Sequence, residues 1–367
     1  MRLGIDTSTM IEEEEAGVKY FDAGREVDPF LLFKNNNVDL MRIRIWNDPY
    51  SEDGKPYLGG TNDLEQAIKI IRETKRYGFG YCINFHYSDF WVDPMKQRLP
   101  KAWENYTLEE LKQAVYDYTK SSLETIKKED IKVDYIQIGN EITNGMLWPY
   151  GKLVYDEKTK TRSNYENFVA FLNEGIKAAR EVYPNAKIII HLESPHEFHK
   201  YEEVLSNLEK YKVDYDVLGT SYYPYWHGTM DNLFKNIKVI NDKYHKPVMI
   251  CELGYGFTLK DYMLNNNGFN QMKVNPDTLT TGMPYPMTPE GQADFIEDFV
   301  NRCKVNKVEG VMYWEPLWRQ AEGICWASRE GQKYINEEGK STRNEWANQC
   351  FFDYEGNKLP AFDKYKL

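Results

Sequence analysis

The sequence predicts an α/β fold, a (β/α)8 TIM barrel, in which eight parallel strands alternate with helices. Eight short runs recur along the whole chain, and most are apolar throughout, as expected for strands that are covered on both faces. The intervals between them carry helical patterns, and this alternation is typical of the barrel. The expected strands cover residues 3–6, 40–46, 81–86, 135–140, 187–192, 217–222, 248–252 and 310–314.

The expected helices carry their own start and stop signals. Residues 63–77 have apolar side chains at helical spacing, and Gly78 ends the pattern. Residues 108–126 follow Thr107, and Glu110 stands three positions after that threonine, which is the pattern of a capping box. Further helical patterns cover residues 165–182, 233–244 and 289–303.

We expect the chain, residues 1–367, to form a single domain with long βα loops. Its length exceeds the ~250 residues typical of this barrel, so the surplus must lie in loops. No linker rich in proline, glycine or serine divides the sequence. The longest interval between strands, residues 253–309, is interpreted as a long loop after the seventh strand, followed by a helix.

The composition excludes several classes of protein. A net charge of −11 and 41% hydrophobic residues exclude a disordered chain and disfavour nucleic-acid binding through a basic face. The five cysteines are odd in number and include no CxxC pair, so no disulfide framework is expected. No leader and no run of 18 apolar residues occurs, which predicts a soluble protein, cytoplasmic as the chain stands and secreted if a signal peptide has been removed. Aromatic residues, at 15%, exceed the need of a core and suit stacking on sugar rings.

Two glutamates, Glu141 and Glu252, directly follow apolar strands, at the strand ends where this fold places its chemistry. Burial of an unpaired carboxylate is unfavourable, so the plain alternative is a side chain that turns to solvent or pairs with Arg44. The two strands are the fourth and seventh, which face each other across an eight-stranded barrel. A retaining glycosidase needs two carboxyl groups ~5–5.5 Å apart, one as acid and base and one as nucleophile. The pair therefore favours glycoside hydrolysis.

Polar residues at other strand ends fit the same hypothesis. Asn140, beside the first glutamate, can hold a sugar 2-hydroxyl, and a turn residue is the alternative. Arg44 and Tyr222 can each donate a hydrogen bond to the second glutamate and keep it ionised, whereas a structural ion pair is the alternative for the arginine. His86 can orient the nucleophile or contact sugar, or it is a histidine of the barrel wall with satisfied hydrogen bonds.

Tryptophans follow the third, sixth and eighth strands. An aromatic face stacks on the apolar face of a pyranose ring without any need for charge. For any single tryptophan, packing of a loop against the barrel is the alternative. Four tryptophans at one mouth of the barrel make that alternative less favoured. The candidates for sugar stacking are Trp91, Trp226, Trp314 and Trp318, whereas Trp103, Trp148, Trp326 and Trp346 are expected to be packing residues.

Six segments combine these residues: MRIRIWNDP (41–49), GGTND (59–63), HYSDFWVDP (86–94), QIGNEITNGMLWP (137–149), SYYPYW (221–226) and YWEPLW (313–318). In these segments the chain resembles the endo-β-1,4-galactanases of glycoside hydrolase family 53, in the large clan of retaining (β/α)8 glycosidases. The resemblance covers nearly the whole chain. The asparagine–glutamate pair alone is shared by the entire clan, whereas the six segments together are specific.

The resemblance implies that Glu141 is the acid/base and Glu252 the nucleophile. It also implies that the strand-end residues named above surround the sugar at the cleavage point, and that Asp89 and Trp91 belong to a neighbouring subsite. The substrate would be β-1,4-galactan, including type I arabinogalactan of pectin, cut internally with retention of configuration. No metal or organic cofactor is expected. The expected protein is a monomer whose partner is the polysaccharide, with no nucleic acid and no membrane.

The chain departs from the family pattern in three places. Leu253-Gly254-Tyr255-Gly256 follows the nucleophile where Thr-Ser-Tyr-Pro is usual, and Glu193 stands where an aspartate is usual. The loop after the seventh strand has Asp261 and then asparagines at 265–267, whereas some bacterial members bind calcium there. Hard cations prefer several charged oxygens, so we expect no tight calcium site. These changes affect the number of subsites and leave the chemistry intact.

Three other functions fit part of the pattern. Another retaining β-glycanase of the same clan would use the same glutamates to cut mannan or glucan. A non-catalytic galactan-binding barrel would keep the cleft, although the presence of both glutamates argues against it. A phosphate-binding barrel enzyme such as an aldolase is disfavoured, because no lysine ends a strand and the loop after the eighth strand is rich in tryptophan.

Overall fold

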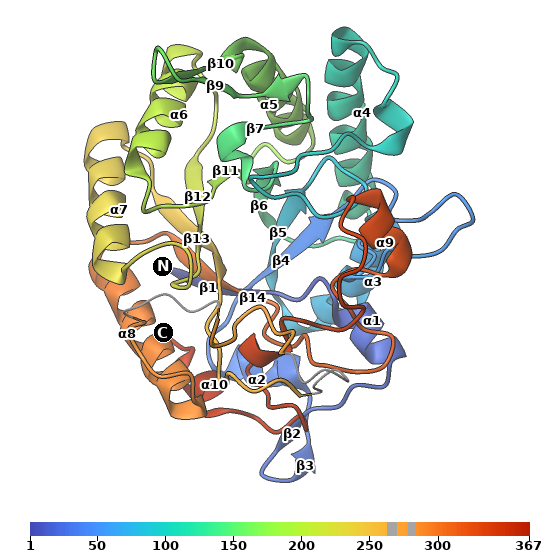
Figure 1. Cartoon of the computed structure of the whole chain (residues 1–367), viewed down its shortest axis with the longest axis vertical. Coiled ribbons are helices and arrows are strands. Elements are labelled where there is room, and N and C mark those ends of the chain that lie inside the picture. Colours follow the sequence, from blue (N-terminus) through green and yellow to red (C-terminus); the bar gives the residue numbers. More distant parts are fainter. Residues whose placement is uncertain (263–269, 278–282) are drawn as a thin grey trace.

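The computed structural model describes residues 1–262, 270–277 and 283–367. Eight parallel strands close into a barrel in the order β1-β14-β13-β12-β11-β6-β5-β4. Figure 1 shows these strands at the centre of the molecule with helices around them. The barrel strands are β1 (Arg2–Asp6), β4 (Leu40–Ile45), β5 (Gly80–Phe85), β6 (Val133–Ile138), β11 (Lys187–Leu192), β12 (Val217–Tyr222), β13 (Val248–Leu253) and β14 (Gly310–Trp314).

The predicted strands are all confirmed, each to within two residues at either end. Their uniform hydrophobicity has the expected cause, because the strands are covered by side chains inside the barrel and by helices outside it. Each of the eight strands buries every residue but at most one, and only the first residue of β11 is exposed.

The helices begin at the signals that the sequence carries. Thr107 caps α4, and the carboxylate of Glu110 completes the capping box. After α3 the chain forms one 3-10 turn and then reverses at Gly78, which has a φ of 68°. The helices around the barrel are α2 (Pro29–Asn35), α3 (Leu64–Thr74), α4 (Leu108–Lys127), α5 (Tyr165–Val182), α6 (Phe198–Lys210), α7 (Met230–Tyr244), α8 (Pro289–Val305) and α10 (Pro360–Lys364); α1 (Met10–Glu15) and α9 (Arg329–Tyr334) lie in loops.

Three helices of this ring, α2, α6 and the short α10, are not among those that the sequence predicts. The first two carry only weak signals. In α2, the carboxylate of Asp28 caps the backbone N–H groups of Phe30 and Leu31, and Pro29 occupies the first turn. In α6, Tyr201 and Leu208 belong to a buried face at helical spacing. The first helix is short, and the second has no side-chain cap, so both give weak sequence signals.

The barrel interior has an apolar layer below and a polar layer above. The apolar layer consists of Leu40, Cys82, Tyr135, Ile189, Val217, Met249, Cys251 and Met312. Above it, Asp6, Arg42, Arg44 and Gln137 are buried toward the carboxyl ends of their strands. Every second residue of a strand faces into the barrel, so one strand can supply an inward side chain to each layer. The polar layer forms the floor of the site described below.

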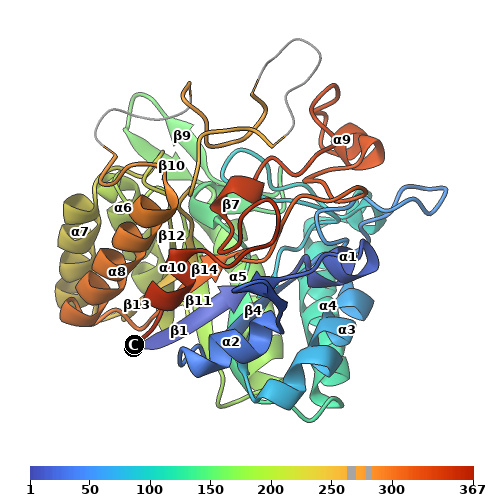
Figure 2. The same ribbon diagram turned by 90° about the horizontal axis from the view of Figure 1, so that it is seen from below.

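Long loops extend from the carboxyl ends of the strands. The loop after β6 holds η3 (Ile142–Asn144) and the hairpin of β9 (Val154–Asp156) and β10 (Thr161–Ser163). In Figure 2 this hairpin and α9 lie at the upper end of the molecule, and the C-terminus lies at the lower end. Among the described residues, no helix combines the length and the hydrophobicity that crossing a membrane requires.

Candidate active site

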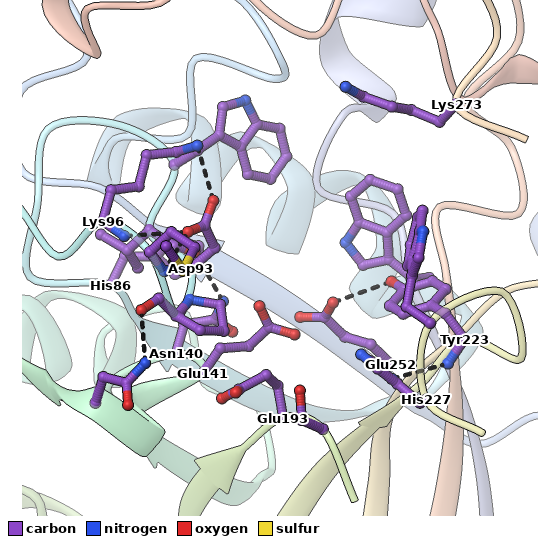
Figure 3. A pocket seen from close by; sticks show the side chains of 18 of the residues that line it. His86, Asp93, Lys96, Asn140, Glu141, Glu193, Tyr223, His227, Glu252 and Lys273 are labelled. Atoms are coloured by element: carbon purple, nitrogen blue, oxygen red, sulfur yellow. Dashed lines mark hydrogen bonds and ion pairs between the residues drawn. The ribbon is translucent and has the colours of Figure 1, made fainter. Parts of the chain in front are cut away.

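Glu141 and Glu252 meet at the carboxyl end of the barrel. Glu141 lies in the turn after β6, and Glu252 lies near the end of β13. One carboxylate oxygen of each lies within 4.8 Å of the other, and a ring nitrogen of His191 lies within the same distance of both. Figure 3 shows the two carboxylates directed toward each other. This separation fits the ~5–5.5 Å of a retaining pair of carboxyl groups and is shorter than the ~6.5–9.5 Å of an inverting pair.

Two donors hold the Glu252 carboxylate. Nη1 of Arg42 lies 3.0 Å from one oxygen, and the hydroxyl of Tyr223 donates to the other across 3.0 Å. An irregularity in the pairing of β12 with β13 brings Glu252 opposite Ser221 and turns the carboxylate to this position. Burial raises the pKa of Glu252, and both donors oppose that shift. The side chain is therefore oriented and its charge is supported from two sides.

The prediction that Arg44 and Tyr222 donate to Glu252 is wrong. The residues that contact Glu252 are near them in the sequence: Arg42 in place of Arg44, and Tyr223 in place of Tyr222. Nη1 of Arg44 pairs with Glu315 at 2.5 Å, so this arginine takes the alternative, a structural ion pair. The Tyr222 hydroxyl donates instead to a loop carbonyl, and its ring stacks on Phe299 of α8, outside the barrel. Strand alternation explains the second error, because the residue after an inward-facing one faces outward.

Glu141 has a different environment. Its φ of 51° lies in the left-handed region, which is uncommon for a residue with a side chain and which the surrounding turn must impose. Oγ of Ser221 donates to its carboxylate across 2.5 Å. Burial raises the pKa of Glu141 well above its usual range, and the charges of Glu252 and Glu193 raise it further. No cation contacts it among the ion pairs of the described residues.

His191 supports Glu141 from below. Its Nδ1 lies 3.1 Å from both Nε2 of Gln137 and Oδ1 of Asn140, and the backbone N–H of Glu141 points to it across 3.4 Å. The two N–H donors assign Nδ1 as the acceptor. The ring hydrogen then lies on Nε2, which is 3.0 Å from Oγ of Ser221. Burial lowers the pKa of His191 well below its usual range, and the ring stays neutral. Both ring nitrogens are engaged, so although Glu141, His191 and Glu252 could hold a metal by type, the histidine is already committed to hydrogen bonds.

A buried network below the carboxylates fixes Arg42. Its Nη1 pairs with Asp6 at 2.8 Å, its Nη2 donates to Oδ1 of Asn140 across 2.7 Å, and its Nε donates to Gln137 across 3.1 Å. A guanidinium with each nitrogen engaged is held in one orientation. The same contacts fix Asn140 beside the cleft.

The two glutamates lie in a cavity of about 600 Å³ with aromatic walls. Trp91, Trp226 and Trp314 line it, and Trp226 is 41% exposed. His86, Asn140 and Arg44 also line it, as the sequence predicts. Nδ1 of His86 accepts a hydrogen bond from the indole of Trp46 across 3.0 Å, so its hydrogen lies on Nε2.

Besides Tyr222, two further expected site residues do not line the cavity. Asp89 accepts backbone hydrogen bonds from Asp48 and Lys101, at 3.0 Å and 2.7 Å, and so holds two loops together. Trp318 is 1% exposed and packs behind Trp91, with ring centroids 6.3 Å apart. Both support the wall and do not form its surface.

Several residues of the cavity are not among those that the sequence predicts. Trp326 and Trp346, which were expected to be packing residues, both line it, as do Asp93, Glu193 and His227. The rings of Trp326 and Trp91 stack at a centroid distance of 6.3 Å and an angle of 4°. The loop that follows β14 brings both tryptophans back over the barrel mouth. The single signal for them is the tryptophan content of that loop.

Asp261, in the loop after β13, accepts a hydrogen bond from the backbone of Gln271 across 2.8 Å and pairs with Arg343. The asparagines at 265–267, on which the calcium expectation rests, lie outside the described residues. The pairing with Arg343 occupies the Asp261 carboxylate.

Fold and cleft together define a glycoside hydrolase built on a (β/α)8 barrel. The model of glycosyl hydrolase family 53 matches residues 2–365. An endo-beta-1,4-galactanase of Bacillus subtilis is 35% identical, over 99% of this chain and 85% of its own length. An arabinogalactan endo-beta-1,4-galactanase of Cellvibrio japonicus is 32% identical, over 99% and 90%. The chain therefore belongs to glycosyl hydrolase family 53.

Solved structures agree with the fold. The catalytic domain of a family 53 protein from Ignisphaera aggregans superimposes with a TM-score of 0.86 at 36% identity, covering 100% of this chain and 95% of that one. A structure from a study of two fungal beta-1,4-galactanases gives a TM-score of 0.76 at 25% identity, covering 100% and 98%. These likenesses confirm the barrel that the sequence predicts.

Proposed function

We propose that this protein is a retaining endo-β-1,4-galactanase in which Glu141 is the acid/base and Glu252 the nucleophile. The observation that carries the proposal is the short separation of the two carboxylates, within 4.8 Å, in an aromatic cleft. The family and the galactanase relatives support galactan, including type I arabinogalactan, as the substrate. The whole chain acts as one catalytic unit and works as a monomer.

In the first step, Glu252 attacks the anomeric carbon of the bound galactosyl unit while Glu141 gives its proton to the glycosidic oxygen. The bond from that carbon to the oxygen breaks, and the remainder of the chain leaves with a new hydroxyl. A galactosyl ester of Glu252 remains, with the α configuration. In the second step, Glu141 removes a proton from water, which attacks the same carbon and releases a β product.

The electrostatics divide these roles between the two glutamates. Glu141 has a strongly raised pKa and two neighbouring carboxylates, so it holds a proton where an ordinary glutamate has lost it. Glu252 contacts Arg42 and Tyr223, which favour the ionised form. The acid and the nucleophile therefore need no metal to differ in protonation, and activity should survive a chelator.

Six residues of the cavity wall are proposed to contact the sugars. Arg44, His86 and Asn140 offer hydrogen-bond donors, and Trp91, Trp226 and Trp314 offer stacking faces. Asn140 remains the candidate for the sugar 2-hydroxyl, because its position is fixed by Arg42. Asp89, Tyr222 and Trp318 act behind the wall.

The test is hydrolysis of β-1,4-galactan measured against mannan and cellulose, with NMR of the first anomer formed. We expect release of galacto-oligosaccharides from galactan alone and a β anomer at early times. A preference for mannan or glucan would replace the galactanase with another β-glycanase of the clan. An α anomer would refute the two-step mechanism, and binding without any hydrolysis would indicate a galactan-binding barrel.

Removal of the Tyr223 hydroxyl should weaken the nucleophile. A hydrogen bond to a charged group contributes ~1.5–3 kcal/mol, so Tyr223→Phe should lower kcat/KM on galactan about ten- to a hundredfold. The hydroxyl lowers the pKa of Glu252, so its loss raises that pKa. The acid limb of the pH profile of kcat/KM should therefore move to higher pH. The matched control is Tyr222→Phe, whose hydroxyl contacts a loop carbonyl; equal effects of the two variants would contradict the assignment.

A further inference from the structure

A second groove adjoins the cleft where the β9–β10 hairpin approaches α6. This hairpin groove has a volume of about 690 Å³, and Tyr155 and Thr161 of the hairpin and His199 of α6 line it. Asn144 and Lys200 line both the groove and the cleft, so the two spaces are neighbours at these side chains. Figure 1 shows the hairpin beside α6.

The groove lies on the acid side of the catalytic pair. The pKa of Glu141 responds to the charges of both Glu252 and Glu193, and the pKa of Glu193 responds to Lys200, which borders the groove. Asn144, the other shared residue, follows the acid by three positions in the same turn. In the proposed mechanism the leaving part of the substrate extends from the acid, away from the nucleophile. The groove therefore lies on the side of the cleft toward which the leaving part of the substrate extends in that mechanism.

The hairpin is fixed to the catalytic turn. Nη1 of Arg162 donates to the carbonyl of Thr143 across 2.7 Å, and its backbone N–H donates to Glu203 of α6. Arg162 is 8% exposed, although it lies in a hairpin whose other residues are exposed. A surface held from both sides in this way binds a ligand with little loss of its own entropy.

The chemistry of the groove suits a neutral polyhydroxy ligand. Its charged side chains are paired: Lys160 with Glu157 at 2.8 Å, Glu202 with Lys243 at 2.6 Å, Arg162 with Glu203 at 3.8 Å and Lys200 with Glu197. Tyr155 is 49% exposed, and an aromatic face of this kind stacks on a pyranose ring. Paired charges next to an exposed ring favour sugars over an anionic ligand.

We propose that the hairpin groove binds neutral galactosyl units of the leaving part of the substrate, with Tyr155 as their stacking surface. The inference rests on the proposed function. It predicts that the enzyme gains rate from sugars several positions beyond the cleavage point. The contribution is confined to substrates long enough to reach the hairpin.

The test compares Tyr155→Ala with the parent on two substrates: long galactan and an aryl galactobioside, whose leaving group is too short to enter the groove. We expect kcat/KM on galactan to fall about three- to tenfold, and kcat/KM on the aryl glycoside to stay unchanged. With galactohexaose labelled at its reducing end, cleavage should shift toward that end, because binding on the leaving side is weaker. Tyr155→Phe should behave as the parent.

Two controls make the test decisive. Tyr106→Ala removes a tyrosine that is 36% exposed beside α4, outside both the cleft and the groove, and should change neither rate. Thr161→Trp fills the groove and should reproduce the loss on galactan even if the alanine variant folds poorly. Equal rates of the parent and both groove variants on galactan, or equal losses on the two substrates, would overturn the groove assignment. Failure of the parent itself to cut galactan would instead overturn the proposed function.

Discussion

Replacing Glu252 by alanine should lower kcat on galactan by about 10⁴-fold or more, because no group remains to form the glycosyl ester. The cavity that the substitution leaves is lined by Arg42 and Tyr223, which lose their shared partner but keep their other surroundings. Substrate contacts with the tryptophan walls are unchanged, so binding should persist. Reducing-end release measures the first effect, and calorimetric titration with galactohexaose measures the second.

Azide distinguishes loss of the nucleophile from loss of structure. It fits the space of the missing carboxylate and attacks the anomeric carbon from the face that Glu252 uses, so Glu252→Ala with an aryl β-galactobioside should form an α-glycosyl azide. The bond from the anomeric carbon to the aryl oxygen breaks as the bond to azide forms, and the aryl group leaves as the phenol with the proton of Glu141. Absence of rescue in a folded variant, or a β-glycosyl azide as the product, would contradict the assignment of Glu252.

The architecture could be predicted because the alternation of buried strands and amphipathic helices gives the sequence a repeating pattern of hydrophobic residues. Each strand is covered on both faces and is apolar over its length, so the run at residues 187–192 marks β11 to the residue. Helices with a cap and a long amphipathic face, such as α4, are equally clear. The helix α6 is less clear because no side chain caps its start.

The two central glutamates of the site could be predicted from the sequence, but the residues that contact them could not. Position at a strand end identifies Glu141 and Glu252, whereas the choice between Arg42 and Arg44 depends on height in the barrel, which the sequence does not encode. Both arginines face inward, and the one lower in the barrel reaches Glu252 while Arg44 reaches Glu315. Trp326 reaches the cleft through a long loop, and no local pattern tells a loop that folds back over the mouth from one that packs elsewhere.

Replacing Glu141 by alanine should affect the two steps differently. With galactan, whose leaving oxygen needs a proton, kcat should fall about 10²- to 10⁴-fold. With a dinitrophenyl β-galactobioside, whose leaving group needs none, the first step should persist and the glycosyl ester should accumulate as a burst. Azide attacks that ester from the opposite face, so this variant should form a β-glycosyl azide. An α-glycosyl azide, or equal losses on both substrates, would contradict the role of Glu141.

Glu193 provides a matched test of why Glu141 holds its proton. The Glu193 carboxylate is buried, burial raises its pKa to about 7, and its charge raises the pKa of Glu141. Glu193→Gln removes that charge at similar volume, so the pKa of Glu141 should fall. The reaction needs protonated Glu141, so activity is lost above that pKa, and the basic limb of the kcat/KM profile should move to lower pH. In Glu141→Ala the basic limb should disappear from the residual activity on galactan, whose leaving oxygen needs the proton. A basic limb that stays in place in the Glu193 variant would assign the raised pKa of Glu141 to burial and Glu252 alone.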